Sequence, residues 1–301
     1  MIVSIILTCY KQEKYIEETI LSVINQSFKD RELLVWDDSP ADICRNIISE
    51  YVKKYPDKIK AWHHNSNKWI VNNMQFLIEQ RNKKSEYVAF LEWDDCLFPE
   101  YLEKKLEIFK KYQNTQLVYN ELTTVNEKWK VINKKELKFC NWIFSKKWKI
   151  SYNELVSNTY YMSRSTLMVR SEAIKKYDLI PTFLSDRTII SDIYFFNQVA
   201  HNEDIYGIED PLTYYRIQEN SVSKNINWWI KYFLELLEYY KYLLNNWMIT
   251  KKIYRERVNK RYLLISTMSL KKSLSMWIFS TIRLFIIECF LAIKKRIRNV
   301  L

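Results

Sequence analysis

The sequence has almost no glycine, since Gly207 is the single glycine among 301 residues. The loops that cradle phosphate in dinucleotide-binding and P-loop proteins need several glycines at fixed spacing. Both classes are therefore excluded. A phosphate-bearing ligand would have to be held in another way, and a divalent cation bound to carboxylates is the simplest.

Cysteine and histidine are also scarce. The cysteines stand at positions 9, 44, 96, 140 and 289, and the histidines at 63, 64 and 201. This spacing contains no Cys-x-x-Cys pair and matches none of the common zinc-finger patterns. We expect buried, reduced thiols in a cytoplasmic protein. The chain starts with a strand pattern and has no charged leader before it, so we also expect no export signal.

The composition is that of a folded enzyme-sized protein, with 48% hydrophobic and 16% aromatic residues. The net charge of +12 is confined to the C-terminal part. Residues 224–301 hold 16 Lys and Arg against 4 Asp and Glu, which leaves 31 of each sign in residues 1–223. We expect this basic tail to be helical and to face a surface of opposite charge.

Within the tail, Leu274–Ile293 is mostly apolar and comes close to the length of about 20 residues that spans a bilayer. Arg283 and Glu288 interrupt it, which favours a helix lying on an anionic membrane surface over a spanning helix. The alternative is an ordinary amphipathic helix packed on the rest of the protein.

Nucleic acid is another partner that a basic, aromatic tail can suggest, because aromatic rings stack on bases. Here Trp228, Trp229, Tyr239, Tyr240 and Tyr242 recur with leucines at helical spacing, which indicates a packed helix. No nucleic-acid motif accompanies them. We therefore predict no nucleic-acid partner.

The most informative segment is Phe90–Asp95, an apolar run that ends in the carboxylates Glu92, Asp94 and Asp95. Ligands of open α/β sheets bind at the carboxyl ends of strands. A divalent cation bound with a diphosphate needs only one or two protein carboxylates. The pattern therefore indicates a metal site of a sugar-nucleotide enzyme. The alternative is that Asp94 or Asp95 caps a helix opening near residues 99–100.

A second acidic pair, Asp37 and Asp38, follows another apolar run, Leu33–Trp36. Before it lie a run at Val3–Thr8 and a helical pattern at Tyr15–Asn25. A strand, helix, strand unit implies parallel strands with a right-handed crossover. We therefore expect Thr8, Asp37 and Glu92 to emerge at one edge of the sheet.

Residues 3–11, 22–27, 34–39, 86–95 and 210–223 together resemble family 2 glycosyltransferases of the GT-A fold. The resemblance implies an α/β fold, with a mixed, mostly parallel sheet flanked by helices and a C-terminal helical extension. The expected domains are a catalytic domain at 1–223 and the basic tail at 224–301. Residues 1–115 would form the nucleotide half and 116–223 the acceptor half, with an insertion at 126–149.

The resemblance also implies residue roles. The nucleoside would be held by Thr8, Tyr10, Asp37 and Asp38, and manganese or magnesium would be held against the diphosphate by Glu92, Asp94 and Asp95. Asp192 would be the general base. Asp192 is locally an equally good N-cap for a helix at 193–200. Arg216 is expected to hold phosphate by bidentate contact, or else to pair with Asp210 or Glu219.

Four departures from the family pattern stand out. Glu92 replaces Asp, Ser39-Pro40 replaces Gly-Ser, Ser191 replaces an acid and Gln218 replaces a frequent His. None of them removes a carboxylate that the chemistry requires. Arg164 carries no motif, and a structural role or an acceptor contact fits it equally well.

We predict an inverting, metal-dependent glycosyltransferase, peripheral on the inner face of the plasma membrane. It would move one sugar from a nucleotide-diphospho-sugar, with UDP-sugars favoured, to a lipid-linked or outer-core glycan of a bacterial capsule or lipopolysaccharide. One alternative is a catalytically silent scaffold docked on the membrane. Another is a nucleotidyltransferase, although Cys9–Gln12 lacks the glycine-rich, basic loop that such enzymes use.

Overall fold

The structure is a computed structural model that describes residues 2–40, 42–64, 67–132, 151–158, 163–179, 183–185, 187–219 and 226–276. The chain divides into two compact units, Met1–Glu219 and Asn220–Leu301. The expected insertion at 126–149 lies outside the described residues from 133 onward. The apolar stretch Leu274–Ile293 lies outside them from 277 onward.

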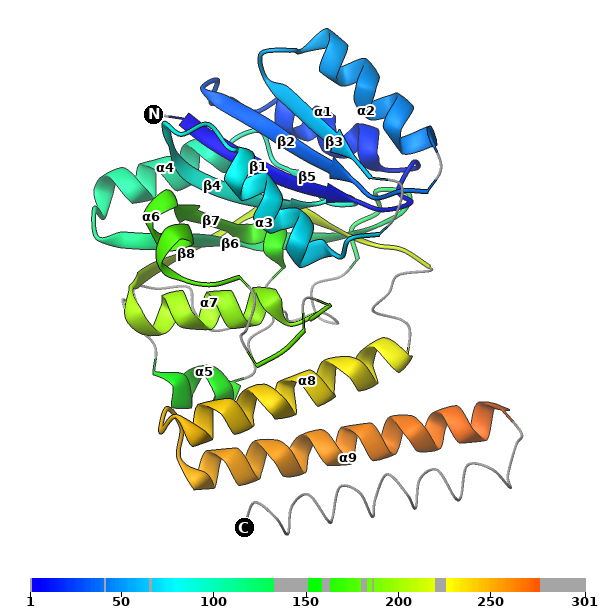
Figure 1. The fold of residues 1–301 in the computed structure, drawn as a ribbon, viewed down its shortest axis with the longest axis vertical. Helices are drawn as coiled ribbons and strands as arrows, with labels where there is room; N and C mark the ends of the chain where they lie inside the picture. Colours follow the sequence, from blue (N-terminus) through cyan, green and yellow to red (C-terminus); the bar gives the residue numbers. More distant parts are fainter. Residues whose placement is uncertain are drawn as a thin grey trace. The chain divides into compact units, whose positions relative to one another are not determined.

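The first half of unit 1 alternates strands and helices, as the apolar runs predict (Figure 1). Its elements are β1 (Ile2–Cys9), α1 (Ile16–Ile24), β2 (Arg31–Asp37), α2 (Asp42–Lys54), β3 (Ile59–His63), α3 (Ile70–Gln80) and β4 (Ser85–Glu92). The strands pair in parallel in the order β3-β2-β1-β4. Almost every residue of β1, β2 and β4 is buried, which is typical of a parallel sheet covered on both faces.

The second half adds four strands to the same sheet. Its elements are β5 (Cys96–Leu97), α4 (Tyr101–Lys111), β6 (Thr115–Asn126), α5 (Tyr152–Asn158), the 3₁₀ turn η1 (Arg164–Thr166), β7 (Leu167–Arg170), α6 (Ser171–Lys176), α7 (Ser191–Asn202) and β8 (Asp204–Ile217). β7 pairs antiparallel with β4 and β6, whereas the long strands β6 and β8 run parallel. The result is one mixed sheet of eight strands, so the two expected halves share it.

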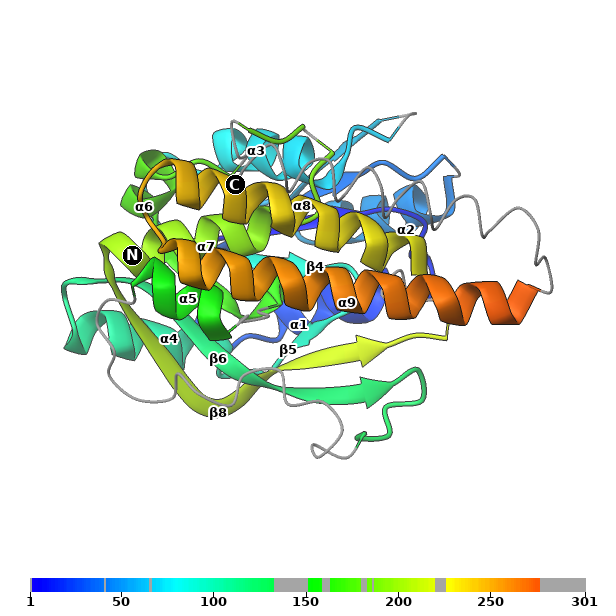
Figure 2. The ribbon, with the colours of Figure 1, turned by 90° about the horizontal axis from the view of Figure 1, so that it is seen from below.

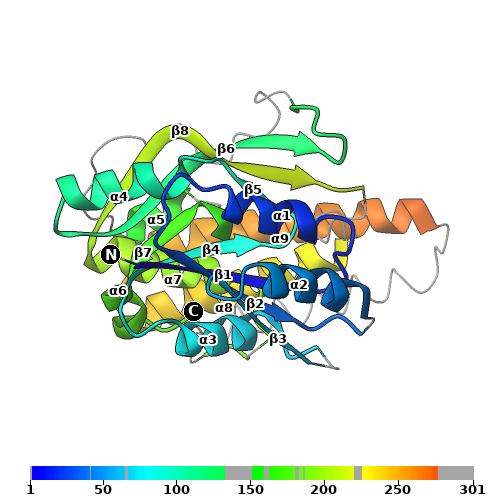
Figure 3. The same cartoon turned by 90° about the horizontal axis from the view of Figure 1, so that it is seen from above.

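Helices pack on this sheet through apolar stripes. In α1, Ile16, Ile20 and Val23 recur at helical spacing and are buried in the core against β1. Figure 3 shows α1 and α2 side by side, and α3 contacts β1 and β2. The guanidinium of Arg31 donates to the carbonyl oxygen of Val23 at 2.7 Å and to that of Ile24, which satisfies the open end of α1. The turn into β2 is thereby fixed.

Unit 2 contains the helices α8 (Ile226–Asn245) and α9 (Lys251–Met276), which lie side by side (Figure 2). Arg261 is buried, with its guanidinium 5.0 Å from the centre of the Phe233 ring. Tyr239 and Tyr240 are also buried. Within the described part of the chain, no helix combines the length and apolarity needed to cross a bilayer.

Candidate active site

The carboxyl ends of β1, β2 and β4 meet at one edge of the sheet. Cys9 lies opposite Asp37 in the ladder, and Thr8 lies opposite Glu92. The prediction that Thr8, Asp37 and Glu92 emerge together is confirmed. The loops that leave these strands carry Tyr10, Asp38, Asp94 and Asp95, so the edge gathers most of the predicted site residues.

Asp38 is tied into the fold. One carboxylate oxygen, Oδ1, accepts a hydrogen bond from Trp36 Nε1. The other, Oδ2, accepts from the backbone N–H of Lys68 at 2.7 Å and from Asn73 Nδ2 at 2.6 Å. Asp38 is buried, and its charge is matched by three donors. Its position therefore anchors the loop before α3 to the end of β2.

The carboxylate of Asp37 can accept more hydrogen bonds than it receives. Its Oδ1 accepts the backbone N–H of Ser39 at 2.9 Å, whereas no donor among the described residues bonds to its buried Oδ2. His63 Nδ1 lies 3.4 Å from this oxygen. Of the two acidic residues at the end of β2, Asp37 is thus the one with a carboxylate oxygen to offer a ligand.

The turn after β1 borders Asp37. Thr8 is buried and Tyr10 is half-buried. Lys11 has a positive φ of 54°, and its backbone N–H donates to Ser39 Oγ at 2.8 Å. Ser39, which departs from the family's glycine, therefore joins the two turns at the sheet edge.

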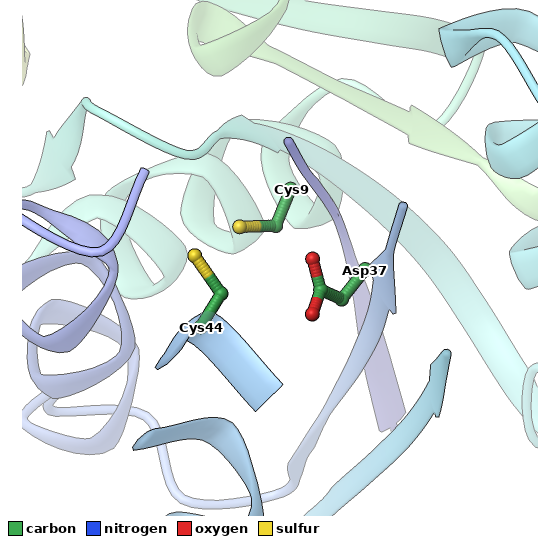
Figure 4. A group of neighbouring side chains, drawn as sticks. All are labelled: Cys9, Asp37 and Cys44. Atoms are coloured by element: carbon green, nitrogen blue, oxygen red, sulfur yellow. The ribbon is translucent and has the colours of Figure 1, made fainter. Parts of the chain in front are cut away.

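Two cysteines lie beside the same carboxylate (Figure 4). The Cys9 and Cys44 thiols interact with each other, and this contact raises the pKa of Cys9, aided by burial, while it lowers the pKa of Cys44. Both residues are buried, as expected for reduced thiols, and so is Cys96. Their proximity was not predictable from a separation of 35 residues along the chain.

Asp95 is fully engaged within the protein. Its Oδ2 accepts from Ser165 Oγ at 2.6 Å and from Ser163 Oγ at 3.4 Å, and its Oδ1 accepts the backbone N–H of Arg216 at 3.1 Å. The side chain is buried, which raises its pKa despite these donors. Asp95 therefore joins the end of β4 to η1 and β8.

Asp94 and Glu92 are less enclosed. Asp94 accepts one side-chain hydrogen bond, from Gln218 Nε2 at 2.6 Å. Burial, followed by the charge of Glu92, raises the pKa of Asp94 to about 7. Gln218, which replaces the family's histidine, thus contacts the acidic loop directly. Neither aspartate caps a helix, because α4 begins at Tyr101 with Glu100 before it, so that alternative is wrong.

Arg216 is 3% exposed and has partners of its own. Its Nε donates to the Asp94 carbonyl oxygen at 2.9 Å, and its Nη2 pairs with Glu18 at 2.5 Å. Asp210 pairs instead with Lys104, so the alternative pairing of Arg216 with Asp210 is not what is observed. To contact phosphate, the guanidinium would have to exchange Glu18 for the ligand.

Arg164 is a site residue whose contacts the sequence could not indicate. Its Nε pairs with Glu92 Oε1, and its Nη1 donates to Ser191 Oγ at 3.4 Å. Its charge also lowers the pKa of Asp192. Arg164 therefore links the end of β4 to the start of α7. No local pattern connects positions 72 residues apart, so a single sequence offers no signal for it.

Asp192 lies in the first turn of α7. Because the helix begins at Ser191 and follows Ile190, the alternative role of Asp192 as N-cap is wrong. Burial raises the pKa of Asp192, and the charge of Glu92 acts in the same direction. The predicted base is thus in the electrostatic field of the predicted metal ligand.

Comparisons with known proteins relate the chain to one protein family. Residues 4–178 match the family described as Glycosyl transferase family 2. The putative glycosyltransferase EpsE of Bacillus subtilis is 30% identical over 42% of this chain, and the match spans less than half, 44%, of EpsE. The putative teichuronic acid biosynthesis glycosyltransferase TuaG of the same organism is 24% identical over 74% of this chain and 82% of its own.

Solved structures show the same fold. The S. aureus TarS structure, residues 1–349 in complex with UDP-GlcNAc, has a TM-score of 0.62 and 19% identity, covering 92% of this chain and 78% of that one. The mannosyltransferase PcManGT of Pyrobaculum calidifontis, in complex with GDP-Man and Mn²⁺, has a TM-score of 0.62 and 12% identity. The match covers 99% of this chain and 82% of PcManGT.

Proposed function

The chain belongs to glycosyltransferase family 2 and is a glycosyltransferase of the GT-A fold, and from this we propose an inverting, metal-dependent transfer of one sugar from a nucleotide-diphospho-sugar. One observation carries the proposal. Glu92, Asp94 and Asp192 share one electrostatic environment at the sheet edge: burial raises the pKa of both aspartates, and the charge of Glu92 acts on both in the same direction. Perturbed carboxylates grouped in this way are typical of catalytic sites.

The residues present fit a divalent cation. Glu92 and Asp94 offer hard oxygen ligands, the type that magnesium and manganese prefer. Burial and the charge of Glu92 both disfavour the ionised form of Asp94, and a cation bound to the pair would relieve this cost. Asp95 already gives both oxygens to internal donors, so we assign it to holding the loop and Glu92 and Asp94 to holding the cation. When bound, the cation would neutralise charge on the diphosphate.

The nucleoside is proposed to lie over the ends of β1 and β2. Asp37 Oδ2 is an acceptor that no described residue uses, and it suits the imide N–H of uracil. Thr8 and Tyr10 line the adjoining turn. We therefore favour a UDP-sugar donor. Asp38 and Arg216 would act indirectly, by fixing the loops that carry the contacting groups.

Asp192 is proposed to take the proton from the attacking hydroxyl of the acceptor. Burial brings its pKa up toward the operating pH, which strengthens it as a base. Arg164 holds Glu92 and reaches Ser191, so it keeps the base and the metal ligand in a fixed relation. Attack on the anomeric carbon opposite the departing diphosphate inverts the configuration.

The acceptor proposal rests on relatives and on charge. TuaG is named for teichuronic acid biosynthesis, so we propose a glycan of a bacterial surface polysaccharide as the acceptor, attached to a lipid carrier. The 16 Lys and Arg of residues 224–301 would hold the enzyme on the anionic inner face of the plasma membrane. Binding to vesicles with and without anionic lipid tests this part.

The decisive experiment is donor hydrolysis across UDP-, GDP- and dTDP-sugars, with manganese or with EDTA. The wild type is compared with Asp94→Ala, with Asp192→Ala and with Asp210→Ala, an exposed carboxylate of the same unit. We expect turnover of one nucleotide class that needs metal, is lost in Asp94→Ala and is unchanged in Asp210→Ala. If no donor is hydrolysed and none raises the melting temperature, the scaffold interpretation replaces the enzyme.

A further inference from the structure

Three buried side chains with metal-binding atoms meet beside the ends of β1 and β2. The Sγ atoms of Cys9 and Cys44 and a carboxylate oxygen of Asp37 all lie within 4.8 Å of one another. Cys9 ends β1, Asp37 ends β2 and Cys44 lies in the first turn of α2, so three separate elements supply the group. Each of the three residues is at most 1% exposed.

A second observation points to a ligand between them. Asp37 is 0% exposed, and its Oδ2 receives no hydrogen bond from any described residue. A buried carboxylate oxygen without a donor is costly unless a cation or another donor pairs with it. Figure 4 shows the Asp37 oxygens directed toward the two thiols, and the thiols directed toward each other.

Further ligand atoms surround this group. His63 Nδ1 lies 3.4 Å from Asp37 Oδ2 and, like it, is buried without a hydrogen-bond partner among the described residues. The Cys44 thiol also donates to the exposed carboxylate of Glu13 at 3.7 Å. A fourth ligand, which a tetrahedral site requires, could therefore come from His63 or from Glu13.

We propose that Cys9, Asp37 and Cys44 form a binding site for a thiophilic divalent cation of the zinc and cadmium type. Thiolates select such ions, whereas the all-oxygen pair Glu92 and Asp94 suits magnesium or manganese. Ligand atoms of a tetrahedral zinc site lie about 3.8 Å or less apart, as follows from bonds of about 2.0–2.3 Å. Separations within 4.8 Å need only small side-chain adjustments to reach this. Binding releases the protons of both thiols.

The site has a consequence that rests on the proposed function. Asp37 Oδ2 is also the group assigned to the nucleoside base, so the ion and the nucleotide would compete for one oxygen. Zinc would then inhibit the transferase by weakening nucleotide binding. It would act at a place separate from Glu92 and Asp94.

The test is a cadmium titration of the full chain, kept reduced with a phosphine and followed by the ultraviolet charge-transfer absorption of cadmium thiolates. Cys9→Ser and Cys44→Ser are compared with Cys96→Ser, a matched buried cysteine outside the cluster. We expect one ion with the absorption of two thiolates in the wild type and in Cys96→Ser. In Cys9→Ser and Cys44→Ser we expect the affinity for cadmium to fall by about tenfold or more. Zinc should displace the cadmium.

Equal cadmium affinity in all four proteins would overturn the site, because the ion would then be bound elsewhere, for example by Cys140 or Cys289. Absence of binding to the reduced wild type would overturn it as well. Melting in EDTA shows whether each variant is folded, and Asp37→Asn, which keeps the size of the side chain, should also weaken cadmium binding. UDP affinity is measured separately with magnesium present and without cadmium or zinc. Cadmium binding without UDP binding would refute the nucleoside assignment and leave the metal site standing.

Discussion

Replacement of the adjacent carboxylates Asp94 and Asp95 should affect stability to different degrees. Asp95 accepts from Ser165 Oγ at 2.6 Å and from the Arg216 N–H at 3.1 Å, and it is buried. Asp94 accepts one side-chain hydrogen bond, from Gln218, and is repelled by Glu92. We predict that Asp95→Ala destabilises unit 1 and that Asp94→Ala does not.

The magnitude follows from the bonds lost. Each hydrogen bond to a charged group contributes about 1.5–3 kcal/mol, and Asp95→Ala leaves a buried hydroxyl and a buried N–H without an acceptor. Removing a carboxylate whose pKa is raised by burial recovers part of this. The expected net loss is about 2–4 kcal/mol, or roughly 4–16 °C in melting temperature for a unit of this size. For Asp94→Ala the change should stay within about 1 kcal/mol, because relief of charge repulsion offsets one hydrogen bond.

The assay is urea unfolding of the full chain in EDTA, with Asp95→Asn as the conservative control. Asn keeps one oxygen as an acceptor, so its loss should be intermediate. Near-wild-type stability of Asp95→Ala, or a destabilisation of Asp94→Ala as large as that of Asp95→Ala, would refute the division of roles between the two residues.

Three further predictions concern the same site. In metal-free protein the pKa of Asp94 is about 7, above its value in the unfolded chain, so the folded state binds more protons between about pH 4 and 7. Unfolding free energy should therefore fall as pH rises through this window, and Asp94→Asn should flatten the slope. Asp192→Asn should lower kcat by about 10²–10⁴-fold while UDP affinity and melting temperature stay unchanged; an unchanged kcat would eliminate Asp192 as the base. Arg164→Met removes the charge that lowers the pKa of Asp192, so the acidic limb of the pH–rate profile should shift to higher pH, and a shift to lower pH would contradict the assignment.

Part of the nucleotide side of the fold could be predicted from the sequence, namely β1, α1, β2 and β4, but not α2, β3 and α3. β1, β2 and β4 are continuous apolar runs, and their parallel pairing follows from the crossover rule, so the meeting of Thr8, Asp37 and Glu92 could be predicted. Helix α1 was predicted within one residue at each end, because its apolar positions have a clear period.

The contacts that organise the site could not be predicted. Arg216 reaches Glu18 across 198 residues, and Arg164 reaches Glu92 only because β7 inserts beside β4. No periodicity connects such positions. Asp94 and Asp95 have distinct roles because only Asp95 faces η1. The conformation of the turn after β4 decides which of the two aspartates does so. Local helix-start signals gave wrong alternatives for Asp94, Asp95 and Asp192, because α4 and α7 begin elsewhere.

The acidic loop that carries Asp94 and Asp95 can gain all of its hydrogen-bond partners only after the end of β8 has been synthesised. Asp95 accepts a hydrogen bond from the backbone N–H of Arg216, which lies 121 residues later in the chain. Asp94 accepts one from the side-chain amide of Gln218, which lies 124 residues later. At about 5–20 residues per second, the ribosome needs roughly 6–25 s to make that interval. Throughout this time the strands that carry Asp37 already exist, while the acidic loop still lacks its partners. A nascent chain that stops short of Gln218 therefore has the nucleoside end of the site without a finished metal end.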